Sequence, residues 1–192
     1  MPTVTRLEPR GGRVAVELDG TPWRVLPADV VVRAGLVSGR ALDRPALREV
    51  RRELRRAEAL GVAVRALRTR DLSRAAVAAR LERAAVPRET AATSLATLER
   101  AGVIDDGRVA RSRALALAAR GYGDAAIRHR LEQEGLAAQA ADALAELEPE
   151  ATRAEAIVAR RGRGARTARY LAGRGFAEEA LEAALGASFG QE

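Results

Sequence analysis

The sequence contains no cysteine, no lysine and no asparagine, and only 3% of its residues are aromatic. Without cysteine there is no disulfide, no thiolate ligand for a metal and no thiol nucleophile. The one histidine, His129, has no second imidazole to complete a metal site, and its place beside arginines is typical of an exposed side chain. We therefore expect no metal, no cofactor and no catalytic residue.

Long apolar segments are also missing. No uncharged run approaches the roughly 18 residues that a membrane-spanning helix needs, and the first residues lack the basic-then-apolar layout of a secretory signal. Apolar residues still make up 47% of the 192 residues, which is enough to supply a core. The sequence therefore predicts a cytoplasmic protein that does not contact a membrane.

Positive charge is concentrated in the first part of the chain. All 33 basic residues are arginine, a bias that, with the absence of asparagine, indicates GC-rich coding more than selection for guanidinium groups. Residues 1–122 contain 24 arginines and 14 acidic residues, a net charge of +10, whereas residues 123–192 contain 9 and 12, a net charge of −3. This polarity suits a partner with an acidic surface, such as nucleic acid or a nucleoprotein. A basic soluble domain without such a partner is the alternative.

The N-terminal segment predicts a β-hairpin. Residues 14–18 alternate between apolar and polar side chains and end at Asp19-Gly20, the sequence of a two-residue hairpin turn, after which a second apolar run follows. A lone hairpin is marginal in water, so we expect it to pack on a short helix over residues 29–34. Residues 1–42 are thus expected to form a small mixed cap.

A basic amphipathic helix is expected to connect this cap to the rest of the chain, over residues 43–60. Its apolar stripe consists of Leu47, Val50, Leu54 and Ala57. Its other faces carry the densest basic group in the chain, Arg48, Arg51, Arg52, Arg55 and Arg56. The alternative interpretation is a solvated face, in which Glu49 and Glu53 pair with the arginines three residues further on.

Beyond residue 61 the sequence repeats itself. Residues 73–81, 123–131 and 163–171 follow one pattern and end at Leu81, Leu131 and Leu171. Five residues after each leucine an apolar residue follows, namely Val86, Leu136 and Phe176, and it is preceded by Ala85, Gly135 and Gly175. A residue in the left-handed conformation there would end one helix and allow the apolar residue to start the next.

Each copy, with a helix before it, predicts a three-helix repeat. The expected repeats cover residues 61–102, 103–148 and 149–192. Helices of about ten residues are marginal alone, so each must be buried within its triplet and against neighbouring repeats. The sequence therefore predicts a mainly α-helical protein, with three tandem three-helix repeats in an elongated array behind the β-hairpin cap.

At these positions the sequence resembles the RecX family. The segment Gly102-Val-Ile-Asp-Asp106 resembles the family's Gly-apolar-apolar-Asp-Asp motif, Arg120-Gly-Tyr-Gly123 resembles its second-repeat pattern, and Arg169-Tyr-Leu-Ala-Gly-Arg-Gly-Phe176 resembles its third-repeat signature. The order and spacing of these motifs together are more specific than any one of them. The Asp105-Asp106 pair, taken without the family, is typical of a helix cap rather than of a catalytic carboxylate pair.

The resemblance implies a bacterial regulator of RecA in DNA recombination, DNA repair and the SOS response. Such a protein lodges in the groove of the RecA filament on single-stranded DNA and restrains its ATPase, strand-exchange and coprotease activities. We expect a monomer that binds RecA without catalysis and that also contacts DNA. The first candidates for partner contacts are Arg51, Arg52, Arg55 and Arg56, and the second are Arg68, Arg70, Arg120 and Arg128.

The sequence gives less support to two other functions. A direct binder of single- or double-stranded DNA would explain the basic first part, but the sequence has no helix-turn-helix, zinc or base-stacking signature. A hydrolase or transferase would need a nucleophile, a base and an orienting group, and no motif supplies them together.

Overall fold

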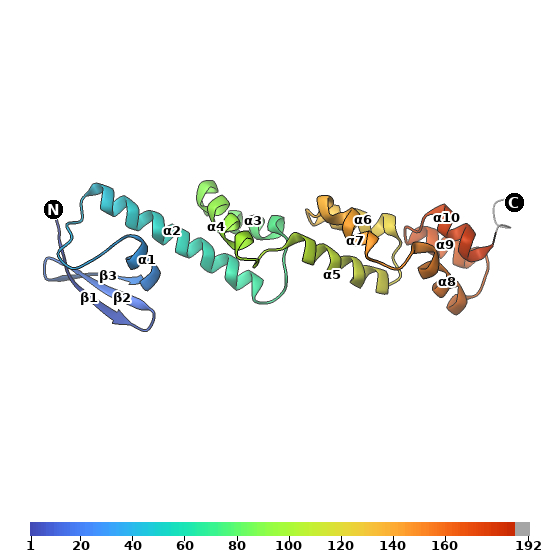
Figure 1. Cartoon of the computed structure of the whole chain (residues 1–192), viewed down its shortest axis with the longest axis horizontal. Helices are drawn as coiled ribbons and strands as arrows, with labels where there is room; N and C mark the ends of the chain where they lie inside the picture. Colours follow the sequence, from blue (N-terminus) through green and yellow to red (C-terminus); the bar gives the residue numbers. More distant parts are fainter. Residues whose placement is uncertain (187–192) are drawn as a thin grey trace. The chain divides into compact units, whose positions relative to one another are not determined.

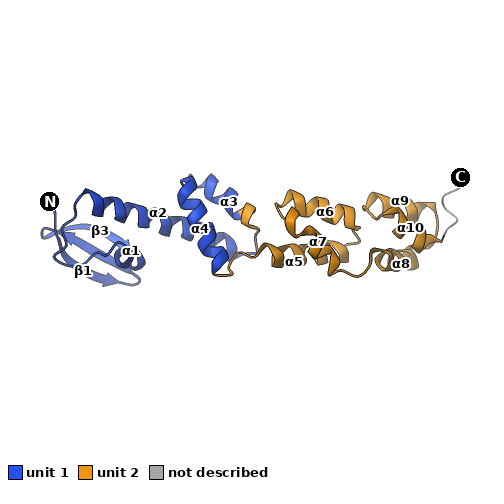
Figure 2. Ribbon diagram, turned by 45° about the horizontal axis from the view of Figure 1, so that its top comes forward, with its two compact units in different colours: residues 1–70, 77–100 blue, residues 71–76, 101–192 orange. Residues whose placement is uncertain are grey.

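The structure is a computed structural model that describes residues 1–186 (Figure 1). The chain divides into two compact units, residues 1–70 with 77–100 and residues 71–76 with 101 onward (Figure 2). It is mainly helical, with an antiparallel three-stranded sheet at its N-terminus, and this confirms the predicted fold class. No helix in the described part is long and apolar enough to cross a membrane.

The N-terminal sheet contains strands β1 (Val4–Arg10), β2 (Arg13–Leu18) and β3 (Thr21–Pro27), in that order. The turn between β2 and β3 lies at Asp19-Gly20, where φ is 48° and 80°. Both residues therefore have the positive φ that a tight two-residue hairpin turn requires. The predicted hairpin is confirmed.

Strand β1 was not predicted, and the expectation of a single hairpin is wrong in this respect. Its pairing with β2 shifts register between Val4 and Arg6. Such a β-bulge adds a residue and breaks the two-residue alternation that identifies a strand. The side chains on the core, Val4 and Leu7, are consequently three residues apart.

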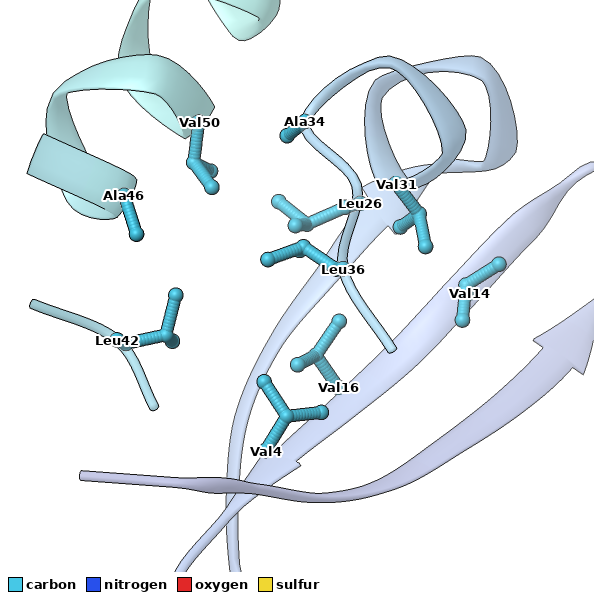
Figure 3. Close-up of a cluster of buried hydrophobic side chains, with 10 residues drawn as sticks. All are labelled: Val4, Val14, Val16, Leu26, Val31, Ala34, Leu36, Leu42, Ala46 and Val50. Atoms are coloured by element: carbon cyan, nitrogen blue, oxygen red, sulfur yellow. The ribbon is translucent and has the colours of Figure 1, made fainter. Parts of the chain in front are cut away.

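The cap has a core of its own, in which helix α1 (Ala28–Arg33) and the start of helix α2 (Arg44–Leu67) cover one face of the sheet (Figure 3). The buried side chains are Val4, Val14, Val16, Leu26, Val31, Ala34, Leu36, Leu42, Ala46 and Val50. They come from both the sheet and the helices, so the sheet is stabilised by the helices, as a small sheet requires. The predicted helix near residues 29–34 is confirmed.

Helix α2 is longer than expected because it runs without a break through Gly61. The sequence suggested one helix that ends near residue 60 and another near residues 62–69. Ala59 and Ala63 on either side of the glycine are fully buried. Packing on both sides offsets the roughly 1 kcal/mol that a glycine costs inside a helix.

The remaining helices form triplets along the chain. After α2 come α3 (Arg74–Arg83) and α4 (Arg88–Arg100), and α2 packs against α4. The next triplet is α5 (Asp106–Ala119), α6 (Asp124–Gln133) and α7 (Ala140–Ala145), with a 3₁₀ turn, η1 (Ala137–Gln139), before α7. The last is α8 (Glu150–Arg161), α9 (Ala165–Gly173) and α10 (Glu178–Leu185). Residues 187–192 of the last expected repeat lie outside the described residues.

The corners between the second and third helices of the triplets share one hydrogen-bond pattern. The backbone N–H of Val86 donates to Leu81 at 3.0 Å, that of Leu136 to Leu131 at 2.8 Å, and that of Phe176 to Leu171 at 3.2 Å. The preceding residues Ala85, Gly135 and Gly175 have φ of 56°, 75° and 79°. This is the Schellman cap that the sequence predicted. The three leucines are at most 1% exposed, as predicted.

Acidic side chains join successive triplets within the second unit. The backbone N–H of Arg74 at the start of α3 donates to Asp106 at 2.7 Å, and that of Asp124 at the start of α6 donates to Glu150 at 2.5 Å. Asp106 and Glu150 are the first residues of the following triplets. A carboxylate from one triplet thus satisfies a free N–H group at a helix start in the preceding one.

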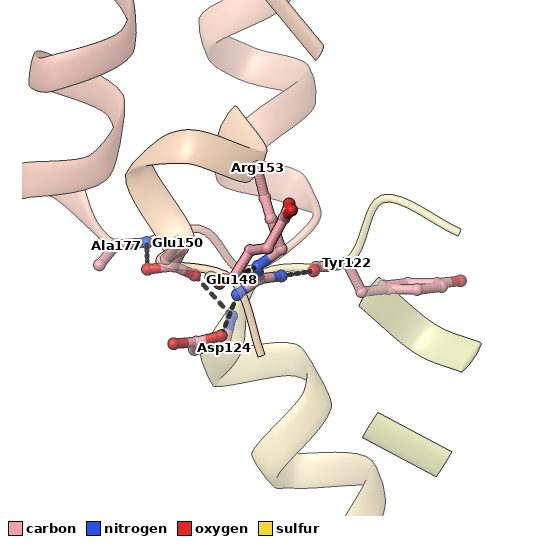
Figure 4. A network of polar contacts seen from close by, with 6 residues as sticks. All are labelled: Tyr122, Asp124, Glu148, Glu150, Arg153 and Ala177. Carbon is pink, nitrogen blue, oxygen red and sulfur yellow. Dashed lines mark hydrogen bonds and ion pairs between the residues drawn. The ribbon is translucent and has the colours of Figure 1, made fainter. Parts of the chain in front are cut away.

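Arg153 strengthens the second of these junctions (Figure 4). Its nearly buried guanidinium forms an ion pair with Asp124 and donates to the carbonyl oxygens of Tyr122 and Glu148 at 2.9 and 3.0 Å. Gly123 lies so close to the next corner that a Cβ there would be 2.3 Å from the backbone of Gly175. Only glycine fits at this contact.

Candidate partner-binding groove

The basic face of α2 begins at a well-formed helix start. The Asp43 side chain accepts a hydrogen bond from the backbone N–H of Ala46 at 2.7 Å, and Pro45 occupies the first turn. Both features favour a helix start here. Val50 is buried and Leu47 and Leu54 are partly buried against the cap core, so the predicted apolar stripe faces the protein and fixes the opposite face outward.

The predicted first-choice arginines come together in a groove of about 600 Å³ within the first unit. Helix α2 supplies its arginines and one acidic residue, Arg48, Arg51, Arg52, Glu53, Arg55 and Arg56. The start of α4 supplies Pro87, Glu89, Thr90 and Thr93. Five guanidinium groups against two carboxylates give the groove a net positive charge. It can therefore bind carboxylate or phosphate groups, for which guanidinium offers paired N–H donors.

Ion pairs within α2 neutralise only part of this charge. Arg52 lies 2.6 Å from Glu49 and its Nε lies 3.8 Å from Glu53. No ion pair found among residues 1–186 involves Arg51 or Arg55, and both side chains are exposed. Of the two pairs that the alternative interpretation requires, only that between Glu49 and Arg52 is therefore formed, and the cations of Arg51 and Arg55 remain unpaired in the groove.

Glu53 does not form the pair with Arg56 that the alternative interpretation requires; its ion pair among the described residues is with Arg52. Glu53 is 7% exposed, one of its carboxylate oxygens has no hydrogen-bond partner, and the same holds for Nε of Arg56. A terminal nitrogen of Arg56 donates to the Thr97 hydroxyl of α4 at 3.4 Å. Burial of the Glu53 carboxylate and of this part of the Arg56 guanidinium costs desolvation free energy.

The second-choice arginines lie outside this groove. Arg68 and Arg70 are exposed at and beyond the end of α2 and do not line it. Arg120 and Arg128 are exposed in the second unit. The structure thus gathers four of the eight candidates and adds Arg48, which the sequence placed on the same basic face.

The sequence did not identify the part that α4 plays in the groove. Thr90 and Thr93 are about forty residues from the arginines along the chain, so no local pattern links them. In the second unit, Arg130, Arg161 and Arg174 were likewise not singled out, although each lies over a tyrosine ring. Contacts of this kind follow from tertiary packing alone.

The part of the chain that the structure describes contains no group of side chains arranged as a catalytic or metal site. No group of three or more His, Asp or Glu side chains is placed to hold a metal ion there. His129 is exposed and shares a hydrogen bond with Gln133 at 2.9 Å. Asp105 is the N-cap of α5, accepting from the backbone N–H of Arg108 at 2.8 Å, and Asp106 caps α3. The predicted role as a cap of the helix that the pair opens is confirmed for Asp105, whereas Asp106 caps the helix of the preceding triplet.

The chain matches known proteins by its structure and not by its sequence. Neither the profiles of known protein families nor the curated protein sequences match the chain. A crystal structure of the regulatory protein RecX is similar with a TM-score of 0.83 and 21% identity, over 96% of this chain and 98% of that one. A RecX structure from Lactobacillus salivarius has a TM-score of 0.59 and 18% identity, over 67% and 92%. The chain therefore has the RecX fold.

Proposed function

We propose that the chain is a RecX-type regulatory protein that binds the RecA filament on single-stranded DNA and restrains its ATPase, strand-exchange and coprotease activities. It acts in the cytoplasm, as a monomer, by binding and without catalysis. The observation that carries the proposal is the likeness to a regulatory protein RecX over 96% of the chain. The RecX-like motifs of the second and third triplets support it independently.

The groove between α2 and α4 is the contact that we assign to this function. Its arginines attract an acidic partner and so speed the encounter. Added salt screens this attraction and weakens binding. Arg51 and Arg55 are the residues best placed to act, because they are exposed, line the groove and form no ion pair within residues 1–186. Arg52 and Arg56 also contact residues of this chain, so a change there would disturb the fold as well.

The direct test is RecA's DNA-dependent ATP hydrolysis and strand exchange, titrated with the wild-type protein and with the variant Arg51→Glu/Arg55→Glu. The matched control is Arg33→Glu/Arg83→Glu, which changes the net charge equally at exposed positions of the first unit outside the groove that are not among the candidate contacts. We expect the wild type to reduce both activities, the groove variant to need a higher concentration, and the control to act almost as the wild type. Far-ultraviolet circular dichroism verifies that all three are equally helical.

The outcomes separate the function from the site. If the wild type at saturation changes neither activity and no RecA binding is detected, the proposed function is wrong. If the wild type acts and the two variants act equally well, the function stands and the assignment of the groove is wrong.

A further inference from the structure

Arginine and tyrosine side chains form a connected cluster in the second unit. The guanidinium carbons of Arg130 and Arg174 lie 4.4 and 4.6 Å from the centre of the Tyr122 ring. Arg174 also lies 5.1 Å from the centre of the Tyr170 ring, over which Arg161 lies at 4.0 Å. The two rings and three guanidiniums thus form a continuous series of cation–π contacts from α6 to α9, which we name the Arg–Tyr ladder.

Arg120 extends this ladder at one end. Its guanidinium carbon lies 5.8 Å from the centre of the Tyr122 ring. Together with Arg130 it lines a small groove of about 200 Å³. The acidic residue of that groove, Glu134, is paired with Arg113 at 3.1 Å. The anion beside the ladder is therefore already neutralised by another residue.

The ladder arginines have no anionic partner among the described residues. None of the ion pairs found in residues 1–186 involves Arg120, Arg130, Arg161 or Arg174. The only hydrogen bond that a ladder guanidinium donates within the described chain is from Arg174 to the carbonyl oxygen of Arg120, at 3.2 Å. This is notable because residues 123–192 have a net charge of −3. Among the described residues, three acids of this region pair with arginines, namely Asp124, Glu134 and Glu146, and none of them pairs with these four cations.

The geometry determines what the ladder can bind. Guanidiniums already cover the tyrosine rings, so the rings offer little free surface on which a base could stack. A guanidinium that lies over a ring keeps its N–H groups at the edge of its plane, where they can donate in pairs to a phosphate. Stacking also restricts the side chain before binding, which reduces the entropy lost when the ligand is bound.

We propose that the Arg–Tyr ladder is a second binding site, which holds the phosphate backbone of a nucleic acid strand without reading its bases. This goes beyond the proposed contact with RecA, since it needs no RecA and lies in the other unit. A protein surface is the less suitable ligand, because interface centres are poor in charge and rich in free aromatic anchors. Here only cationic edges are offered, in a row, to a ligand whose charges also recur in a row.

The test is fluorescence anisotropy of a labelled single-stranded oligonucleotide, titrated with the full chain in the absence of RecA at several salt concentrations. The ladder variant is Arg120→Gln/Arg130→Gln/Arg161→Gln, whose three residues are exposed. The matched control is Arg33→Gln/Arg83→Gln/Arg100→Gln, with the same change in charge at exposed positions of the first unit outside the groove. A further variant, Tyr122→Leu, keeps every charge but removes one ring.

We expect the ladder variant to bind at least ~10-fold more weakly at low salt and to have a salt slope smaller by about 2, since each phosphate contact to a single strand contributes roughly 0.7. The control should bind almost as the wild type. Tyr122→Leu should weaken binding with the slope almost unchanged, because it removes the support of the guanidiniums and not their charge. All variants must keep the wild-type circular dichroism.

Three results would overturn the proposal. The first is no binding of the oligonucleotide by the wild type, and the second is equal loss of binding in the ladder variant and the control. The third is competition by polyglutamate as strong as by unlabelled DNA and dependent on the ladder, which would assign the site to an acidic protein. None of these results concerns RecA, so a failure here leaves the proposed function intact.

Discussion

The carboxylate of Glu150 accepts a hydrogen bond from the backbone N–H of Asp124 at 2.5 Å, although 26 residues separate the two along the chain. Its other oxygen accepts from the backbone N–H of Ala177 at 3.2 Å. One side chain at the start of α8 therefore satisfies N–H groups at the starts of both α6 and α10. The equivalent residue of the preceding triplet, Asp106, caps α3.

We expect Glu150→Ala to destabilise the protein more than Asp106→Ala. The loss of one capping hydrogen bond typically costs about 1 kcal/mol, so the expected loss is about 2 kcal/mol for Glu150 and about 1 kcal/mol for Asp106. Urea denaturation, followed by circular dichroism, gives the free energy of unfolding of each variant. Equal losses would show that the second hydrogen bond of Glu150 contributes nothing.

The leucine before each corner is expected to be a main determinant of stability. Leu131 is 1% exposed and belongs to the core of the middle triplet, with Ile127 and Leu136. Its change to alanine should cost roughly 2 to 5 kcal/mol, from lost burial and the cavity left behind. Leu81→Ala and Leu171→Ala should fall in the same range. An unchanged thermal melting curve for Leu131→Ala would contradict a core position for this leucine.

Substitution of the corner residue should change the stability of the protein in opposite directions in two triplets. Ala85 has φ of 56°, which strains any residue that carries a Cβ, so Ala85→Gly should stabilise the protein by about 1 kcal/mol. Gly135→Ala should destabilise it by more, because the same strain is added and the new Cβ would lie 2.5 Å from Cβ of Ala75. Thermal melting of both variants tests the pair. Destabilisation by Ala85→Gly would contradict the shared cap geometry.

The sequence predicted the helix corners well because their geometry depends on a few neighbouring residues. A buried leucine, a residue in the left-handed conformation and an apolar residue recur at fixed spacing, and the backbone hydrogen bonds follow from that spacing. The same holds for the Asp19-Gly20 turn and for the cap at Asp105. Local rules suffice where the stabilising contacts are themselves local.

The features that the sequence did not reveal depend on contacts between distant residues. Strand β1 was missed because a bulge interrupts its alternation, and Gly61 remains helical because the alanines around it are buried. The alternative interpretation of the basic face left Glu53 solvated, but the residue is buried. For the candidate site, the sequence found the arginines of α2 and not the threonines of α4 that line the groove with them.

A pH dependence is expected from Asp105. The hydrogen bond from the backbone N–H of Arg108, helped by the charge of Arg108 and Arg111, lowers the pKa of this carboxyl below its ordinary value. A lowered pKa in the folded state means that the stabilisation is complete above the ordinary pKa of about 4 and is lost as the pH falls through the lowered value. Asp105→Asn should therefore flatten the fall in melting temperature below pH ~4. An acid limb as steep as that of the wild type would contradict this role.

Loss of the ion pair between Glu49 and Arg52 should make the groove bind its partner more tightly, which tests the groove by a gain of affinity. Glu49 holds Arg52 at 2.6 Å, so Glu49→Gln should release this guanidinium for a partner and add one unit of positive charge beside the groove. The energy of an exposed pair is at most about 1 kcal/mol, so affinity for RecA filaments should rise by roughly two- to fivefold, with a steeper salt dependence.

The matched control is Glu58→Gln, which removes an exposed carboxylate of the same helix outside the groove. Binding is measured by anisotropy of filaments on labelled DNA, at concentrations where the wild type is half bound. If both variants bind equally more tightly, net charge alone decides affinity, whereas tighter binding by Glu49→Gln alone assigns the contact to the groove.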